Sequence, residues 1–152
     1  MKTIIIISTI LIITSCAAPV KMTESDNLIK VYEDTKGTKG ELYLRANDWM
    51  VNTFKDSKSV IQHSDKEEGV ILGKYLLGKS YVSQYRTDEI FAVVDIRLKD
   101  NKSRIEIKPQ GSWLNNGGTL KSYQYTRENA IRDMNKLADS FHKAMQKNAV
   151  DF

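Results

Sequence analysis

Hydrophobic positions alternate along the middle of the chain with the period of a β-strand. Over residues 90–98 every second residue is apolar, namely Ile90, Ala92, Val94, Ile96 and Leu98. Ile105 and Ile107 alternate with charged residues in the same way, which predicts the next strand. Weaker patterns predict a first strand over residues 27–33, and a hairpin formed by residues 59–64 and 70–77 around a turn at residues 65–69.

Two other segments have the period of an amphipathic helix. Thr38 and Glu41 have the spacing of a capping box, in which each side chain bonds a backbone amide at the helix start. The stripe that follows runs through residue 55 and consists of Leu42, Ala46, Trp49, Met50 and Phe54. A second helix is expected from Thr126 to about Lys147, with a stripe formed by Ile131, Met134, Ala138, Phe141 and Met145 and widened by Ala130, Leu137 and Ala144. The order β-α-β-β-β-β-α predicts an α+β fold, an antiparallel sheet of about five strands with two helices on one face.

Charged residues predict how the strands around residues 95 and 106 are joined. A four-residue loop over residues 100–103 places Arg97 opposite Glu106 and Asp95 opposite Lys108. A two-residue loop over residues 100–101 places like charges opposite each other instead. Opposite charges across two strands add about 0.2–1 kcal/mol and like charges destabilise the pair, so we expect the four-residue loop.

The N-terminus has the pattern of an export signal. It begins with Lys2 and an apolar run over residues 4–13, which is shorter than the ~20 residues that span a bilayer and has the length of a signal-peptide core. Ile13-Thr14-Ser15-Cys16 resembles the bacterial lipobox, in which an aliphatic residue and two small ones precede the cysteine to be acylated. The resemblance implies that residues 1–15 are removed and that Cys16 carries the lipid.

Lipidation accounts for the only cysteine of the chain, because an unpaired thiol is unusual in an exported protein. We therefore expect attachment to the membrane through Cys16, a tether over residues 16–26 and a single domain over residues 27–152. Ala17 stands where an aspartate retains some lipoproteins in the inner membrane, and no acidic cluster of the kind linked to surface export lies next to it, so we expect an outer-membrane anchor facing the periplasm. Loss of residues 1–15 removes one lysine and no acid, so the net charge of +4 falls by one. That charge is too mild to indicate nucleic acid.

Several short phrases resemble a known family. In chain order they are Glu41-Leu42-Tyr43, Arg45-Ala46, Trp49, Phe54, Lys58-Ser59-Val60-Ile61-Gln62, Asp65-Lys66-Glu67 and Gly69. They are similar to lipoproteins of Bacteroidetes-type bacteria that carry a domain of unknown function with a TATA-binding-protein-like (TBP-like) fold, and the likeness covers roughly residues 28–108. It implies the fold and no activity. TATA-box recognition uses a sheet built from two repeats that wedges apolar side chains into the minor groove, whereas this chain has one repeat.

The residues that could carry chemistry are scattered. His63 and His142 belong to different predicted elements and lack the spacing of metal ligands. Glu67-Glu68 lies in a predicted turn, where adjacent side chains point apart. Asn116-Gly117-Gly118 lacks the lysine and the following helix of a phosphate-binding loop. We therefore expect no cofactor, no metal and no catalytic set.

Aromatic residues in two predicted loops are the candidate contact residues. Trp113 and Leu114 lie in a glycine-rich loop, where they either form an exposed contact or fold back over the end of the sheet. Tyr81 and Tyr85 lie in a connection over residues 78–88, where they either line a groove or seal a sheet edge.

These observations favour a membrane-tethered binding module, which is not an enzyme and contacts an unknown envelope protein. An alternative is a carrier of a small apolar ligand or lipid, with a cavity between the last helix and the sheet. A third hypothesis, an envelope hydrolase, requires His63 or His142 to lie beside a nucleophile or metal.

Overall fold

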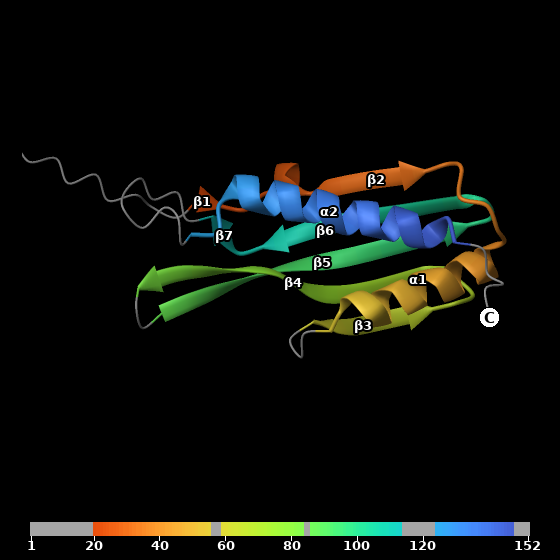
Figure 1. The fold of residues 1–152 in the computed structure, drawn as a ribbon, viewed down its shortest axis with the longest axis horizontal. Helices are drawn as coiled ribbons and strands as arrows, with labels where there is room; N and C mark the ends of the chain where they lie inside the picture. The colour runs from red at the N-terminus through yellow and green to blue at the C-terminus, as the bar shows by residue number, and fades with distance from the viewer. Residues whose placement is uncertain (1–19, 56–58, 84–85, 114–123, 148–152) are drawn as a thin grey trace, which may run out of the picture.

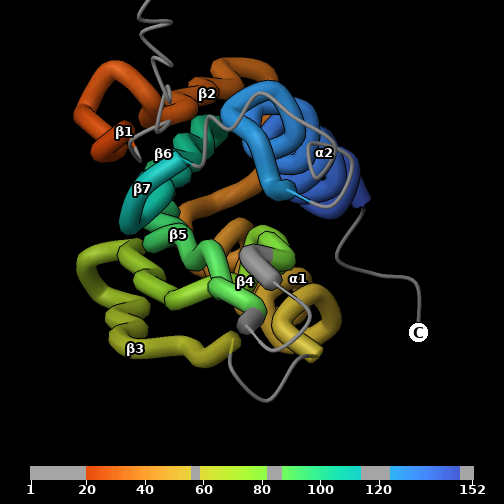
Figure 2. Tube along the Cα trace, turned by 90° about the vertical axis from the view of Figure 1, so that its left-hand side faces the viewer, coloured from red at the N-terminus to blue at the C-terminus, as the bar shows by residue number. Residues whose placement is uncertain are grey.

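Five antiparallel strands form one sheet, and two helices pack on one of its faces (Figures 1 and 2). The computed structural model describes residues 20–55, 59–83, 86–113 and 124–147. Its elements are β1 (Val20–Lys21), the 3-10 turn η1 (Glu24–Asp26), β2 (Leu28–Tyr32), α1 (Lys39–Thr53), β3 (Val60–Asp65), β4 (Val70–Ser83), β5 (Arg86–Lys99), β6 (Lys102–Gln110), β7 (Ser112–Trp113) and α2 (Arg127–Met145). The sheet order is β2-β6-β5-β4-β3, and β1 pairs separately with β7. The predicted α+β class and its order of elements are confirmed.

Both helices begin where their capping residues predicted. The Thr38 hydroxyl accepts a bond from the Glu41 amide at 3.3 Å, and the Glu41 carboxylate accepts one from the Thr38 amide at 2.7 Å. At the second helix the Thr126 hydroxyl accepts a bond from the Asn129 amide. These contacts satisfy backbone donors that the first helical turn leaves without partners.

The core lies between the sheet and the two helices. The buried side chains of α1 are Leu42, Ala46, Trp49 and Met50, and those of α2 are Ala130, Met134, Leu137, Ala138, Phe141 and Met145. Trp49 and Phe141 meet edge to face at 5.2 Å between ring centroids, which joins the two helices. The expectation of a core-facing Ile131 is wrong. Its side chain is 39% exposed, because it lies one residue past Ala130 and turns toward solvent.

The expected four-residue loop between β5 and β6 is also wrong. Lys99 pairs with Lys102, so the turn has two residues, and Asn101 adopts a left-handed φ of 59°, a conformation that asparagine tolerates. Asp95 consequently lies opposite Glu106, and each acid is neutralised along its own strand: Arg97 bonds Asp95 at 2.7 Å, and Arg104 bonds Glu106 at 2.6 Å. These ion pairs offset the repulsion between like charges on opposite strands, which was the reason for predicting a four-residue loop.

The connection expected over residues 78–88 is a hairpin of two long strands. β4 continues to Ser83 and β5 begins at Arg86. The register shifts between Leu76 and Gly78, and again between Tyr81 and Ser83. Each irregularity interrupts the alternation of faces, so the period of two that signals a strand is lost in the sequence.

Candidate functional site

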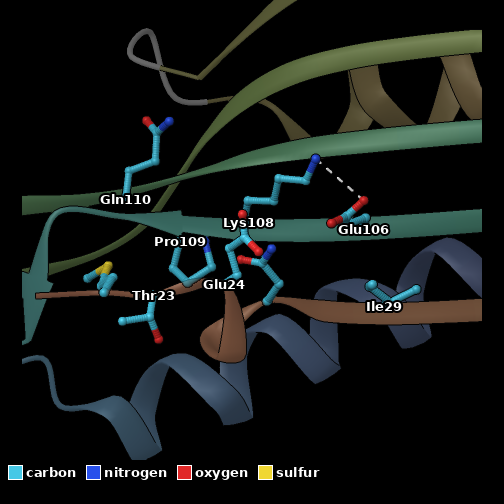
Figure 3. A pocket seen from close by; sticks show the side chains of 9 residues that line it. Thr23, Glu24, Ile29, Glu106, Lys108, Pro109 and Gln110 are labelled. Atoms are coloured by element: carbon cyan, nitrogen blue, oxygen red, sulfur yellow. Dashed lines mark ion pairs between the residues drawn. The ribbon is translucent and has the colours of Figure 1, made fainter.

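An open groove of about 650 Å³ lies on the face of the sheet opposite the helices, beside the N-terminal segment (Figure 3). Its lining combines apolar, amide and charged groups from Met22, Thr23, Glu24, Asn27, Ile29, Glu106, Lys108, Pro109 and Gln110. Glu106 and Lys108 alternate along β6 with buried residues that face the helices, and Ile29 pairs with Glu106. Glu106 and Lys108 therefore lie on the face of the sheet opposite the helices, whereas Met22 lines the groove and also belongs to the hydrophobic core.

The groove forms because the N-terminal segment leaves the edge of β6 and returns to it. The Met22 amide donates to the Gly111 carbonyl at 3.1 Å, and Leu28 pairs with Ile107. Between these two contacts the chain makes the η1 turn. The turn is closed by the Thr23 amide, which donates to the Asp26 carboxylate at 2.9 Å. Residues 23–27 thus bow away from β6 and form one wall.

This course corrects the expectation of a tether over residues 16–26, because the chain is already packed on the domain from Val20. Val20 pairs with Trp113, and Met22 is buried. Arg127 at the start of α2 bonds the Asp26 carboxylate at 2.6 Å. The bond from the Thr23 amide and then the Arg127 guanidinium lower the pKa of Asp26 below its ordinary value.

The charged wall of the groove is held by fixed ion pairs. The Lys108 ammonium lies 3.4 Å from a Glu106 oxygen and 3.9 Å from an Asp95 oxygen. Arg104 bonds the same Glu106 oxygen, so this carboxylate is shared between two cations. Ile29 stands beside this network with 51% of its surface exposed. Apolar surface next to oriented charges suits an amphipathic ligand.

The aromatic residues expected to make contacts do not share one exposed surface. Trp113 is 4% exposed in β7. It therefore packs inward and does not form the exposed contact that was one of its two expected positions. Tyr81 is 53% exposed and pairs with Thr87 across the β4–β5 hairpin. Leu114 and Tyr85 lie outside the described residues.

The two histidines lie on different elements, His63 in β3 and His142 in α2. The His142 ring stacks on Tyr32 with 4.1 Å between ring centroids. Among the described residues, no three or more His, Cys, Asp or Glu side chains are grouped so that they could hold a metal ion.

Buried core side chains lie between the last helix and the sheet, the place suggested for a carrier's cavity. Phe141 and Met145 of α2 and Ile105 and Ile107 of β6 are all 0% exposed. The groove described above lies on the opposite face. Sequence reasoning missed this groove, although β2 carried a signal: Leu28, Ile29, Val31 and Tyr32 place apolar residues on both faces of a strand.

Comparison with known proteins agrees with this architecture. The family profile described as a domain of unknown function (DUF4468) with TBP-like fold matches residues 31–109. The crystal structure of a DUF4468 family protein from Bacteroides ovatus is similar, with a TM-score of 0.57, 14% identity, and coverage of 83% of this chain and 89% of that one. The structure of a TBP-like protein from Parabacteroides distasonis gives a TM-score of 0.55 at 18% identity, covering 80% and 94%. No curated protein matches the chain. No helix among the described residues is long and apolar enough to cross a membrane.

Proposed function

Because the chain belongs to the DUF4468 family, a domain of unknown function with a TBP-like fold, we propose a function from its own residues: it is a lipid-anchored protein of the cell envelope whose domain is a non-enzymatic binding module. The fold by itself does not select an activity, since one fold serves many functions. The proposal therefore depends on two features of the chain, the lipobox at its N-terminus and the groove on the open face of the sheet.

The lipobox supports the anchor. Ile13-Thr14-Ser15-Cys16 ends the apolar run, and the domain begins only four residues later at Val20. Several acyl chains on one cysteine attach a protein to a membrane durably without a transmembrane helix. Two features support the proposed outer-membrane attachment facing the periplasm: Ala17 rather than an aspartate follows the cysteine, and no acidic cluster stands beside it.

The groove carries the binding function. Ile29, in the edge strand β2, keeps about half of its surface in solvent, and the Lys108–Glu106 pair stands next to it. We propose that an amphipathic segment of another envelope protein lies in this groove, with its apolar side chains on Ile29 and its charged groups facing Lys108. Fixed charges orient such a ligand, and apolar contact supplies affinity.

The anchor is tested by metabolic labelling with an alkyne-bearing palmitate in the native host. We expect the full-length protein to be labelled and to sediment with the outer membrane, and Cys16→Ser to lose both properties. Thr9→Ala serves as the matched control, because it leaves the four lipobox residues unchanged. Undiminished labelling of Cys16→Ser would contradict the anchor.

The groove is tested by a photo-crosslinking residue placed at Ile29 in the lipidated chain, in its own host. Leu44 is the matched control, because it is 60% exposed on α1, away from the groove. We expect a discrete protein adduct from position 29, none of the same size from position 44, and loss of the adduct in a Lys108→Glu background. If both positions give the same adduct, or if position 29 gives none, the groove is not the binding site.

A further inference from the structure

We propose that the partner segment binds as an added β-strand, antiparallel to β2 along the free edge of the sheet. The inference rests on the proposed function, because this segment is the one that contacts Ile29 in the groove. It assigns to the segment an extended conformation and a sequence pattern, an acidic residue between two apolar ones.

The strand β2 is the outermost strand of the sheet, and one of its edges is unused (Figure 1). It pairs with β6 from Leu28 to Tyr32 without a register shift. Within the described residues β6 is its only strand neighbour, and its backbone bonds no other backbone group. The outward amides and carbonyls of such an edge are a template for another strand.

The two-residue turn between β5 and β6 determines which backbone groups of β2 point outward. Lys99 and Lys102 flank this turn as a hydrogen-bonded pair, and such pairs alternate with non-bonded ones along an antiparallel ladder. The residues of β6 that bond β2 are consequently 103, 105 and 107, and their partners in β2 are 32, 30 and 28. The amides and carbonyls of Ile29 and Val31 therefore point away from β6, toward the free edge.

This edge also carries apolar side chains that face solvent. Ile29 is 51% and Val31 is 45% exposed on the face opposite the helices. Both are β-branched and pack well along a strand. The other edge strand, β3, has a register shift between Ile61 and His63, an irregularity of the kind that protects an edge from pairing. Since β2 has no such shift, it is the edge suited to accept a strand.

The charge of Lys30 determines the chemistry of the occupant. Lys30 lies between Ile29 and Val31 on the other face of β2, and among the described residues it forms no ion pair. An acidic residue directly opposite Lys30 attracts its ammonium, and apolar residues opposite Ile29 and Val31 cover their exposed surface. A second copy of β2 does not fit, because the antiparallel register that sets Ile29 against Val31 also sets Lys30 against Lys30.

The position of the groove agrees with this direction of binding. Residues 23–27 precede β2 in the chain and form one wall of the groove. A strand that runs antiparallel to β2 passes Val31 first and then Ile29, and it reaches the groove where β2 begins. The residues that follow in the partner are then placed to contact Lys108.

Short photo-crosslinking side chains test the added strand. A diazirine amino acid is placed at position 29 or, in a separate protein, at position 31 of the full-length lipidated chain in its own host. The captured residue of the partner is identified by mass spectrometry, and Leu44 on α1, 60% exposed, is the matched control position. We expect positions 29 and 31 to capture one protein at residues two apart, with the residue captured from position 31 nearer its N-terminus and an acidic residue between them.

Two substitutions separate backbone pairing from side-chain contact. Val31→Pro removes an outward amide without removing a bond to β6, so we expect it to reduce the adduct at position 29 several-fold, whereas Val31→Thr keeps both the amide and the adduct. Lys30→Glu should also reduce the adduct several-fold and Lys30→Arg should keep it. This second pair leaves the backbone unchanged, so it decides the question if circular dichroism shows that Val31→Pro does not fold.

Captured residues with another spacing or order, or no adduct at position 31, overturn the added strand and leave the groove as the binding site. An unchanged adduct at position 29 in folded Val31→Pro or in Lys30→Glu does the same. Capture of a second copy of this chain overturns the assigned partner. Absence of an adduct at position 29 overturns the proposed function, and this inference with it.

Discussion

Gly78 lies under the ring of Tyr125, and the substitution Gly78→Ala tests how closely the segment before α2 packs on the sheet. An ideal Cβ at residue 78 would lie 2.8 Å from Cζ of Tyr125 and closer still to Cδ2 and Cε2. Tyr125 is 6% exposed, and its backbone amide donates to the Ser80 hydroxyl at 3.1 Å. The ring therefore has no room to move aside without losing its own contacts.

The magnitude follows from these contacts. Overpacking a closely packed site costs about 1–3 kcal/mol. A displaced ring also weakens the bond from the Tyr125 hydroxyl to the Asp133 carboxylate, 3.1 Å long, and a hydrogen bond to a charged group contributes roughly 1.5–3 kcal/mol. We expect Gly78→Ala to lower the free energy of unfolding by about 2–4 kcal/mol.

Urea unfolding followed by far-ultraviolet circular dichroism measures this loss, and a double-mutant cycle assigns it to the ring. In a Tyr125→Ala background the clash is absent, so alanine at position 78 should be neutral or stabilising by about 0.5–1 kcal/mol, the usual cost of glycine within a strand. Gly40→Ala is the control, because the nearest atom to its ideal Cβ is 4.0 Å away, and it should stabilise α1. An equal loss from Gly78→Ala in both backgrounds would refute the reasoning.

Three further substitutions test other contacts. The pKa of Asp26 is lowered from 3.8 in the folded protein. The ionised carboxylate therefore stabilises the fold above pH 3.8, and this stabilisation is lost as the pH falls through the folded pKa. Urea titrations should find Asp26→Asn less stable than the unmodified chain at pH 7 and equal to it in strong acid. Arg45→Gln removes a donor that lies 2.8 Å from the Met145 carbonyl, and we expect a loss of about 1.5–3 kcal/mol together with faster amide hydrogen exchange in the last turn of α2. Unchanged amide exchange in the last turn of α2 would argue that the bond from Arg45 to the Met145 carbonyl does not stabilise the end of this helix. Asn101→Ala should be about 1 kcal/mol less stable than Asn101→Gly in thermal unfolding, because both lose the side chain but only alanine is strained at a φ of 59°.

The elements that form from local interactions could be predicted from the sequence. Thr38 and Thr126 marked the starts of both helices because a capping side chain bonds amides only three residues ahead. The alternation over residues 90–98 and at Ile105 and Ile107 identified the faces of β5 and β6 that lie against the helices, since successive side chains of a strand point to opposite sides. The resemblance to a TBP-like family rested on phrases from these same elements, and the family and its fold are confirmed.

The register of β5 and β6 could not be predicted in this way. Moving Ile96 from Ile105 to Ile107 keeps every side chain on its own face, so burial does not distinguish the two pairings. The observed pairing is set by the turn at Asn101 and by ion pairs along each strand, such as Arg97 with Asp95.

What the sequence determined by itself was therefore local: the caps, the periods of the helices and inner strands, and the pattern of an export signal. Only the tertiary structure decided which distant segments meet. The groove needs residues 23–27 to bow away from β6, and that course depends on contacts such as Asp26 with Arg127, which are 101 residues apart. Trp113 is buried because β1 pairs with its strand, β7. Tyr81 is exposed because the β4–β5 hairpin extends beyond the strands β3 and β6 that flank it. No local pattern records such contacts, because their energy arises only when the whole sheet is assembled.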